Sequence, residues 1–139
     1  MLRRDFSGEW TLNTHRTKLQ VAQLANLDSA ILRIEHRDPQ FRLSRRFVLR
    51  GEEHTVSFEL TADGKEVASG AGDQQRFSRL TWDADTLVFS TRFASPSGES
   101  LNVVRYTLTN DRRTLEARER FRSRDLNYDN YWVFERSSQ

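Results

Sequence analysis

The sequence predicts an all-β protein, a single antiparallel up-and-down barrel of about nine or ten strands formed by residues 1–139 as one domain. Segments in which apolar and polar residues alternate recur at intervals of roughly 8–12 residues. The turns between most of them are too short for a parallel crossover, so neighbouring strands should pair antiparallel. An open sheet of this size would leave two long unpaired edges, which favours a rolled sheet.

The N-terminal half contains five predicted strands, bounded by residues that favour turns. Pro39 has a fixed φ angle and cannot donate to a strand ladder, and Asp63-Gly64 is a strong hairpin signal. The segment after Phe41 alternates strictly, so that every second side chain faces the predicted interior. The predicted strands cover residues 8–13, 30–36, 41–50, 54–61 and 67–73.

The C-terminal half contains five more predicted strands, which cover residues 75–82, 86–94, 100–109, 114–124 and 128–136. Segment 14–28 departs from this regular spacing. Its apolar residues loosely fit one face of one or two helical turns: Leu19, Val21, Leu24 and Leu27. We expect a short helix or an ordered loop across one mouth of the barrel, with a plain long loop as the alternative.

The composition excludes several classes of protein. The net charge is +2, there is no cysteine, and the mean hydropathy is −0.77, so neither a disulfide framework nor thiolate chemistry is expected. No apolar run approaches the ~20 residues of a membrane helix. No signal peptide is visible, so the compartment stays open: cytoplasmic as the chain stands, exported if a leader has been removed.

Two charged residues fall on strand faces that should point inward. Arg45 lies between Leu43 and Phe47 in the alternating pattern, and Glu119 lies between Ala117 and Phe121. A charge on an inward face is costly unless it is paired or solvated. Three interpretations remain open: Arg45 and Glu119 pair inside the barrel, Arg45 binds a ligand carboxylate or phosphate, or a bulge or the wet barrel mouth exposes them.

The arginine rows on the predicted outer face favour a solvated surface. Their members should pair across strands with residues such as Glu59 and Glu116, and the near-neutral net charge argues against a nucleic-acid track. The rows are Arg118, Arg120, Arg122 and Arg124, and Arg42, Arg46 and Arg50.

No catalytic or cofactor-binding motif stands out. The three histidines have no metal-ligand spacing, there is no G-x-S-x-G elbow, and Asp83 and Asp85 lie in a predicted hairpin turn. We therefore expect no enzyme activity, no metal and no cofactor.

Both ends of the chain and parts of its middle resemble a known superfamily. The start, Phe6-Ser7-Gly8-Glu9-Trp10, and the end, Tyr131-Trp132-Val133-Phe134, look like the G-x-W opening and final strand of lipocalins and fatty-acid-binding proteins. The segments 34–39, 82–87 and 106–115 resemble bacterial lipocalin-like domains of unknown function. This resemblance implies a barrel in which Trp10 has a structural role and closes the floor, where a cation–π contact would allow the guanidinium of Arg136 to lie over its ring; the alternative is that Trp10 lines a ligand cavity. Tyr131 and Arg136 lack the Arg-x-Tyr spacing of fatty-acid-binding proteins, so a fatty-acid specificity is not implied.

The function that these observations favour is non-catalytic binding of a small, partly apolar molecule, acidic or neutral, inside the barrel. Arg45 with Glu119 would form a polar anchor, Tyr106 would offer a hydroxyl, and the apolar wall would consist of Phe47, Phe58 and Phe89. The alternative is a structural or protein-interaction barrel with a filled interior and no ligand. Interior volume separates the two: a ligand binder needs a pocket on the order of 300 Å³ or more, whereas a filled barrel has aromatic side chains that meet across its centre.

Overall fold

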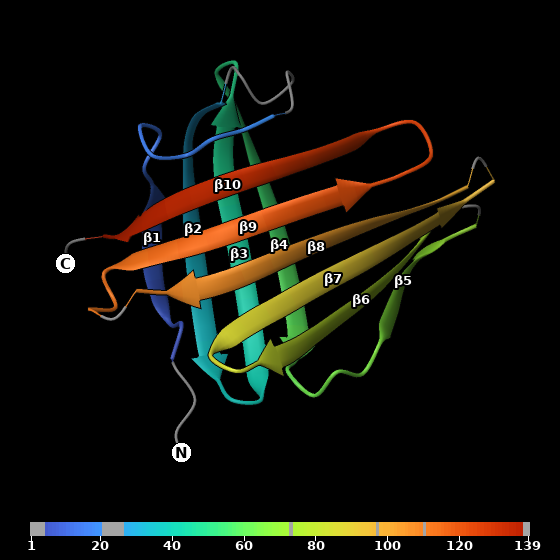
Figure 1. The fold of residues 1–139 in the computed structure, drawn as a ribbon, viewed down its shortest axis with the longest axis horizontal. Helices are drawn as coiled ribbons and strands as arrows, with labels where there is room; N and C mark the ends of the chain where they lie inside the picture. The colour runs from blue at the N-terminus through green and yellow to red at the C-terminus, as the bar shows by residue number, and fades with distance from the viewer. Residues whose placement is uncertain (1–4, 21–26, 73, 97, 110, 138–139) are drawn as a thin grey trace.

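The protein folds into ten β-strands, seen here in a computed structural model that describes residues 5–20, 27–72, 74–96, 98–109 and 111–137 (Figure 1). None of the described residues is helical, and therefore none belongs to a helix long and apolar enough to cross a bilayer. The strands are β1 (Gly8–Leu12), β2 (Leu27–Arg37), β3 (Gln40–Leu49), β4 (Glu52–Thr61), β5 (Val67–Ala71), β6 (Gln74–Asp83), β7 (Thr86–Ser95), β8 (Gly98–Leu108), β9 (Thr114–Arg122) and β10 (Asn127–Arg136).

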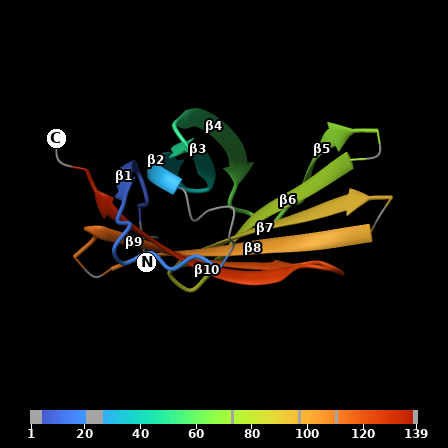
Figure 2. The same cartoon turned by 90° about the horizontal axis from the view of Figure 1, so that it is seen from above.

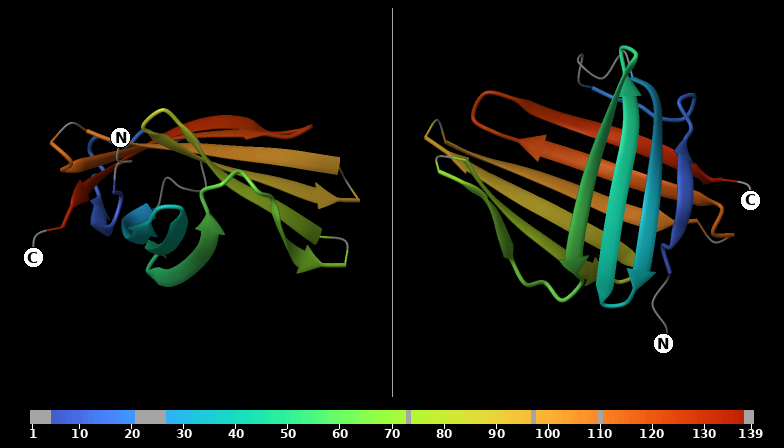
Figure 3. Two further views of the ribbon diagram at one scale, coloured as in Figure 1. Left: turned by 90° about the horizontal axis from the view of Figure 1, so that it is seen from below. Right: turned by 180° about the vertical axis from the view of Figure 1, so that it is seen from behind.

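All ten strands belong to one antiparallel sheet with the order β4-β3-β2-β1-β10-β9-β8-β7-β6-β5. β1 pairs with both β2 and β10, and so joins the first strands of the chain to the last one. The sheet curls round on itself, and β4 and β5 are its two end strands. Figures 2 and 3 show the result, in which β2–β4 cross over β7–β10 as a second layer. The predicted up-and-down barrel is confirmed, and in the structure it is nearly closed.

The predicted alternation decides which side chains face the interior. In β2, Leu32 and Ile34 are buried while Arg33 and Glu35 are exposed. The cross-strand register extends the inward face to both neighbours, since Leu32 lies opposite Trp10 on β1 and opposite Arg45 on β3. A side-chain period of two therefore fixes the inward row of each strand.

Segment 14–20 forms a turn and a short extended stretch, and not a helix. Lys18 and Tyr131 exchange two backbone hydrogen bonds of 2.8 Å each, so this stretch runs beside β10 beyond the end of β1. Backbone groups of β10 that β1 is too short to reach find partners there, which outweighs the weak helical spacing of the leucines. Val21 and Leu24 lie outside the described residues, and Leu27 already belongs to β2.

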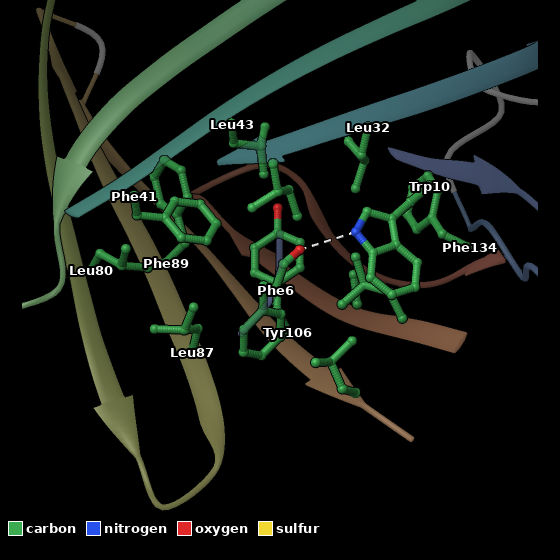
Figure 4. Packing of buried hydrophobic residues seen from close by; sticks show 14 of the residues in the cluster. Phe6, Trp10, Leu32, Phe41, Leu43, Leu80, Leu87, Phe89, Tyr106 and Phe134 are labelled. Carbon is green, nitrogen blue, oxygen red and sulfur yellow. Dashed lines mark hydrogen bonds between the residues drawn. The ribbon is translucent and has the colours of Figure 1, made fainter. Parts of the chain in front are cut away.

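Trp10 and Arg136 form the joint between β1 and β10. The Trp10 ring is fully buried, its Nε1 donates to the Phe6 carbonyl at 3.1 Å (Figure 4), and the Arg136 guanidinium lies 4.3 Å from its ring centroid. Arg136 also donates from Nη1 to the Ser7 carbonyl at 3.1 Å. Gly8 has a φ of +142°, and a Cβ there would lie 2.5 Å from Arg136 Nη1, so the G-x-W opening needs its glycine. The predicted position of Arg136 over Trp10 is confirmed.

The arginine rows lie on the outer face, where several of them pair with carboxylates as predicted. Arg42 contacts Glu59 across β3 and β4 at 2.9 Å, as predicted, whereas Arg118 and Glu116, 3.9 Å apart, lie on the same strand β9. Tyr131 adds an aromatic ring beneath Arg118, at 4.6 Å from the guanidinium carbon. Exposed pairs of this kind stabilise the fold little, which fits a solvated surface.

Replacing Trp10 with alanine should lower the free energy of unfolding by about 3–5 kcal/mol, because it removes a large buried side chain and leaves a cavity. Urea denaturation followed by circular dichroism measures this. The exposed Thr55 on β4 gives a matched control, for which Thr55→Ala should stay within about 0.5 kcal/mol of the wild type. Equal, small effects of the two changes would contradict the role of Trp10 as the buried joint.

Candidate ligand-binding cavity

One half of the interior is filled by packed apolar side chains. Phe58 of β4 and Phe89 of β7 meet edge to face across the barrel, with ring centroids 5.1 Å apart, and Leu80 and Leu87 are fully buried beside them. Tyr106 of β8 belongs to the same cluster (Figure 4). In this half the structure has the feature expected of a filled barrel.

The other half contains a cavity of about 200 Å³ between the inward faces of β2 and β3 on one side and β9 and β10 on the other. Its volume lies below the range of roughly 300–1,000 Å³ that is usual for drug-sized ligands. Most of its lining is apolar or aromatic, with one cation and one carboxylate. The lining residues are Leu27, Ala30, Arg45, Phe47, Glu119, Tyr128 and Trp132.

Glu119 is held by three N–H donors from neighbouring strands. Its Oε1 accepts from Asn130 Nδ2 at 2.9 Å and from Trp132 Nε1 at 3.0 Å, and its Oε2 accepts from Asn102 Nδ2 at 3.0 Å. A carboxylate accepts at both oxygens, so its charge inside the barrel is largely compensated by these hydrogen bonds. The side chain is therefore fixed in one position.

Arg45 has no comparable compensation. Its position opposite Leu32 and Val56 in the strand register turns it inward, and its Nε atom is buried with no hydrogen-bond partner among the described residues. Its guanidinium carbon lies 5.6 Å from the centroid of the Phe47 ring. Arg45 and Glu119 line one cavity, but among the described residues they do not form an ion pair with each other.

The pKa of Tyr106 depends on its burial and on the two charged side chains of the cavity. Burial raises the pKa of its hydroxyl to about 12, while the nearby charges act in opposite directions: Arg45 lowers this pKa and Glu119 raises it. The hydroxyl of Tyr106 thus lies within electrostatic reach of both charged side chains. It stays protonated, and available as a hydrogen-bond donor, throughout the neutral range.

The predicted site residues divide into two groups. Arg45, Phe47 and Glu119 come together around the cavity, whereas Phe58, Phe89 and Tyr106 pack in the filled half. The sequence analysis missed Leu27, Ala30, Tyr128 and Trp132. Tyr128 and Trp132 are four residues apart on the last strand and so share its inward face, a signal that was available in the sequence.

Asn130 connects the cavity to the segment after β1. It is 3% exposed, its Oδ1 accepts from the backbone N–H of Gln20 at 2.8 Å, and its Nδ2 donates to Glu119. The Gln20 side chain in turn accepts from the backbone N–H of Asp129 at 2.7 Å. The carboxylate in the cavity is therefore supported by a hydrogen-bond chain that reaches the β1–β2 connection.

The histidines lie at separate places. His36 is buried and its Nδ1 accepts from the Phe6 backbone N–H at 3.2 Å, His54 stacks on Phe47 at 5.2 Å, and His15 lies in the turn after β1. In the part of the chain that the structure describes, no three side chains of the metal-ligating types gather.

Comparisons with solved structures find proteins of the same fold, whereas comparisons of the sequence find no relative. No protein-family model matches the chain, and no curated protein is detectably similar to it. Among solved structures, zebrafish ileal bile acid-binding protein in complex with cholic acid is similar with a TM-score of 0.64 and 10% identity, over 95% of this chain and 98% of that one.

Two further solved structures show the same likeness. Secretory abundant heat soluble protein 4 from Ramazzottius varieornatus has a TM-score of 0.59 and 15% identity, with 99% of each chain covered. The fatty-acid-binding protein of Manduca sexta has a TM-score of 0.55 and 14% identity, over 92% of this chain and 98% of that one. At these identities the likeness shows the fold alone: the chain forms an antiparallel up-and-down β-barrel of the same architecture as these proteins.

Because the pKa of Tyr106 is about 12 in the folded protein against an ordinary value of 10.0, its ionisation opposes folding. The stabilising contribution is present below pH 10 and is lost as the pH rises from about 10 to about 12. In a tyrosinate absorbance titration, Tyr106→Phe should remove the last tyrosine to ionise, whereas Tyr131→Phe, on the outer face, should remove an earlier one. Loss of the same early phase in both variants would contradict the burial of the Tyr106 hydroxyl.

Proposed function

We propose that this barrel binds, without catalysis, a small and partly apolar molecule whose acidic group contacts Arg45. The observation that carries the proposal is the state of Arg45: an inward guanidinium whose buried Nε has no hydrogen-bond partner in the described structure. Arginine offers a planar set of donors that matches a carboxylate or a phosphate in two-point contact. An anionic ligand group would supply what the protein itself does not.

The remaining cavity wall supports an apolar body on the ligand. Phe47 and Trp132 present aromatic surface to the cavity, and Leu27 and Ala30 present aliphatic surface. Burial of apolar ligand atoms against such a wall contributes roughly 25 cal/mol per Å². The charged group would then give orientation, and the aromatic wall would give most of the affinity.

The likeness to solved structures supports the same class of function. The similar proteins described above include one named for bile acids and one named for fatty acids. The alternative of a structural or protein-interaction barrel is favoured by two observations: the filled half around Phe58 and Phe89, and a cavity volume of about 200 Å³, below the roughly 300 Å³ expected of a ligand binder. Native mass spectrometry of freshly purified protein, in search of a co-purified small molecule, addresses this alternative directly.

Arg45→Gln should weaken the binding of 2-naphthoate by about ten- to a hundredfold, because a hydrogen bond to a charged partner contributes roughly 1.5–3 kcal/mol. The neutral analogue 2-naphthamide should lose little affinity. Isothermal titration calorimetry measures both. Arg46→Gln is the matched control, since Arg46 is the next residue on β3 but points outward toward Glu53 at 3.4 Å. Equal losses for acid and amide, or an equal effect of Arg46→Gln, would remove Arg45 from the binding site.

A further inference from the structure

The size of the cavity limits the ligand that the proposed site can take. About 200 Å³ corresponds to the space of six or seven water molecules at ~30 Å³ each. That volume suits the buried part of a molecule built on one or two aromatic rings and is too small to enclose an extended acyl chain or a steroid.

The packed half of the interior prevents a longer ligand from extending inward. Phe58 and Phe89 are in ring contact across the barrel, and the nearby Leu43 and Leu80 are 2% and 0% exposed. On the β10 side, Trp132 stacks on Phe134, with ring centroids 6.4 Å apart and Phe134 only 3% exposed. A chain of methylene groups could enter this region only by displacing well-packed side chains, which is costly.

Glu119 favours a second polar group on the ligand, in addition to the acid at Arg45. Three N–H donors occupy its two oxygens, while an ionised carboxylate offers about four acceptor positions. One acceptor position is therefore left for a group on the cavity side. The fixed negative charge repels a second carboxylate and favours an O–H or N–H donor.

From the volume, the aromatic wall and these two opposite charges we infer the ligand class: a compact aromatic acid that also carries a hydrogen-bond donor, such as a hydroxyl or an amine, on its ring or side chain. The acid contacts Arg45, the ring packs against Phe47 and Trp132, and the donor contacts Glu119. A long-chain fatty acid would not be enclosed by this cavity and should bind more weakly. This inference rests on the proposed function, because it assumes an acid bound at Arg45.

The test compares ligands matched in size on the wild-type protein. We choose 3- and 4-hydroxycinnamate, the 3- and 4-methylcinnamates, and palmitate, because a methyl group is close in size to a hydroxyl but cannot donate. Calorimetry should show at least one hydroxy acid binding about tenfold more tightly than its methyl counterpart, the scale of one hydrogen bond to a charged group. Palmitate should bind more weakly than either hydroxy acid.

A variant locates the donor contact. Glu119→Gln should bring the hydroxy and methyl acids to within about threefold of each other, whereas Glu116→Gln, on the outward face of the same strand, should leave the preference unchanged. If Glu119→Gln does not fold, the comparison of ligands on the wild-type protein still decides. If methyl acids bind as tightly as hydroxy acids in both positions, or palmitate binds at least as tightly, the inferred ligand class is wrong.

The outcomes also separate this inference from the proposed function. If 2-naphthoate and the cinnamates bind and Arg45→Gln weakens them, but the hydroxyl gives no advantage, only the ligand class fails. If no acid binds, or if acids bind regardless of Arg45, the proposed function fails and the ligand class fails with it.

Discussion

The barrel depends on the short pairing of β1 with β10. In the hydrogen-bonded sheet, strands β2–β4 and strands β5–β9 are connected through this pair, whose register covers three residue pairs, from Trp10 opposite Arg136 to Leu12 opposite Phe134. So short a ladder gains from side-chain support, and the Arg136 guanidinium over the Trp10 ring supplies it together with its bond to the Ser7 carbonyl. The cavity lies between strands from the two sides of this joint, so its shape is set by the same contact.

The division of the interior into a filled half and a hollow half follows from the kinds of residue that alternate inward. At one level of the barrel the inward positions are held by Leu43, Leu80 and Phe89, which pack without polar atoms to satisfy. At the other level they include Arg45, Asn102, Glu119 and Asn130, whose polar groups need partners or water and cannot close into a dry core. A hollow therefore remains where the polar side chains gather.

The sequence was sufficient for the strands and their inward faces, because these follow from a side-chain period of two. It left open whether Arg45 and Glu119 face the interior or are exposed by a bulge or at the barrel mouth. It was not sufficient to decide which aromatic residues would line the cavity. Phe58 and Trp132 both face inward, yet one packs against Phe89 and the other borders the hollow, and that outcome depends on distances across the barrel. Nor could the sequence show that Asn102, Asn130 and Trp132 would donate hydrogen bonds to Glu119. With Glu119 held by these donors, Arg45 is left without an ion pair to it in the described part of the chain.

Under the proposed function, the cavity is selective because hydrogen bonds from the protein compensate the charge of Glu119 but not that of Arg45. Glu119 is compensated within the protein, so it contributes a fixed acceptor without a large cost in stability. The buried Nε of Arg45 has no such partner among the described residues, so under the proposed function an anion that contacts it would remove part of the cost of its burial. Ligand binding stabilises a fold in proportion to the affinity for the native state alone. An acid that satisfies Arg45 should therefore stabilise the barrel more than a neutral molecule of the same shape, since only the acid adds relief of that cost to the burial of apolar surface.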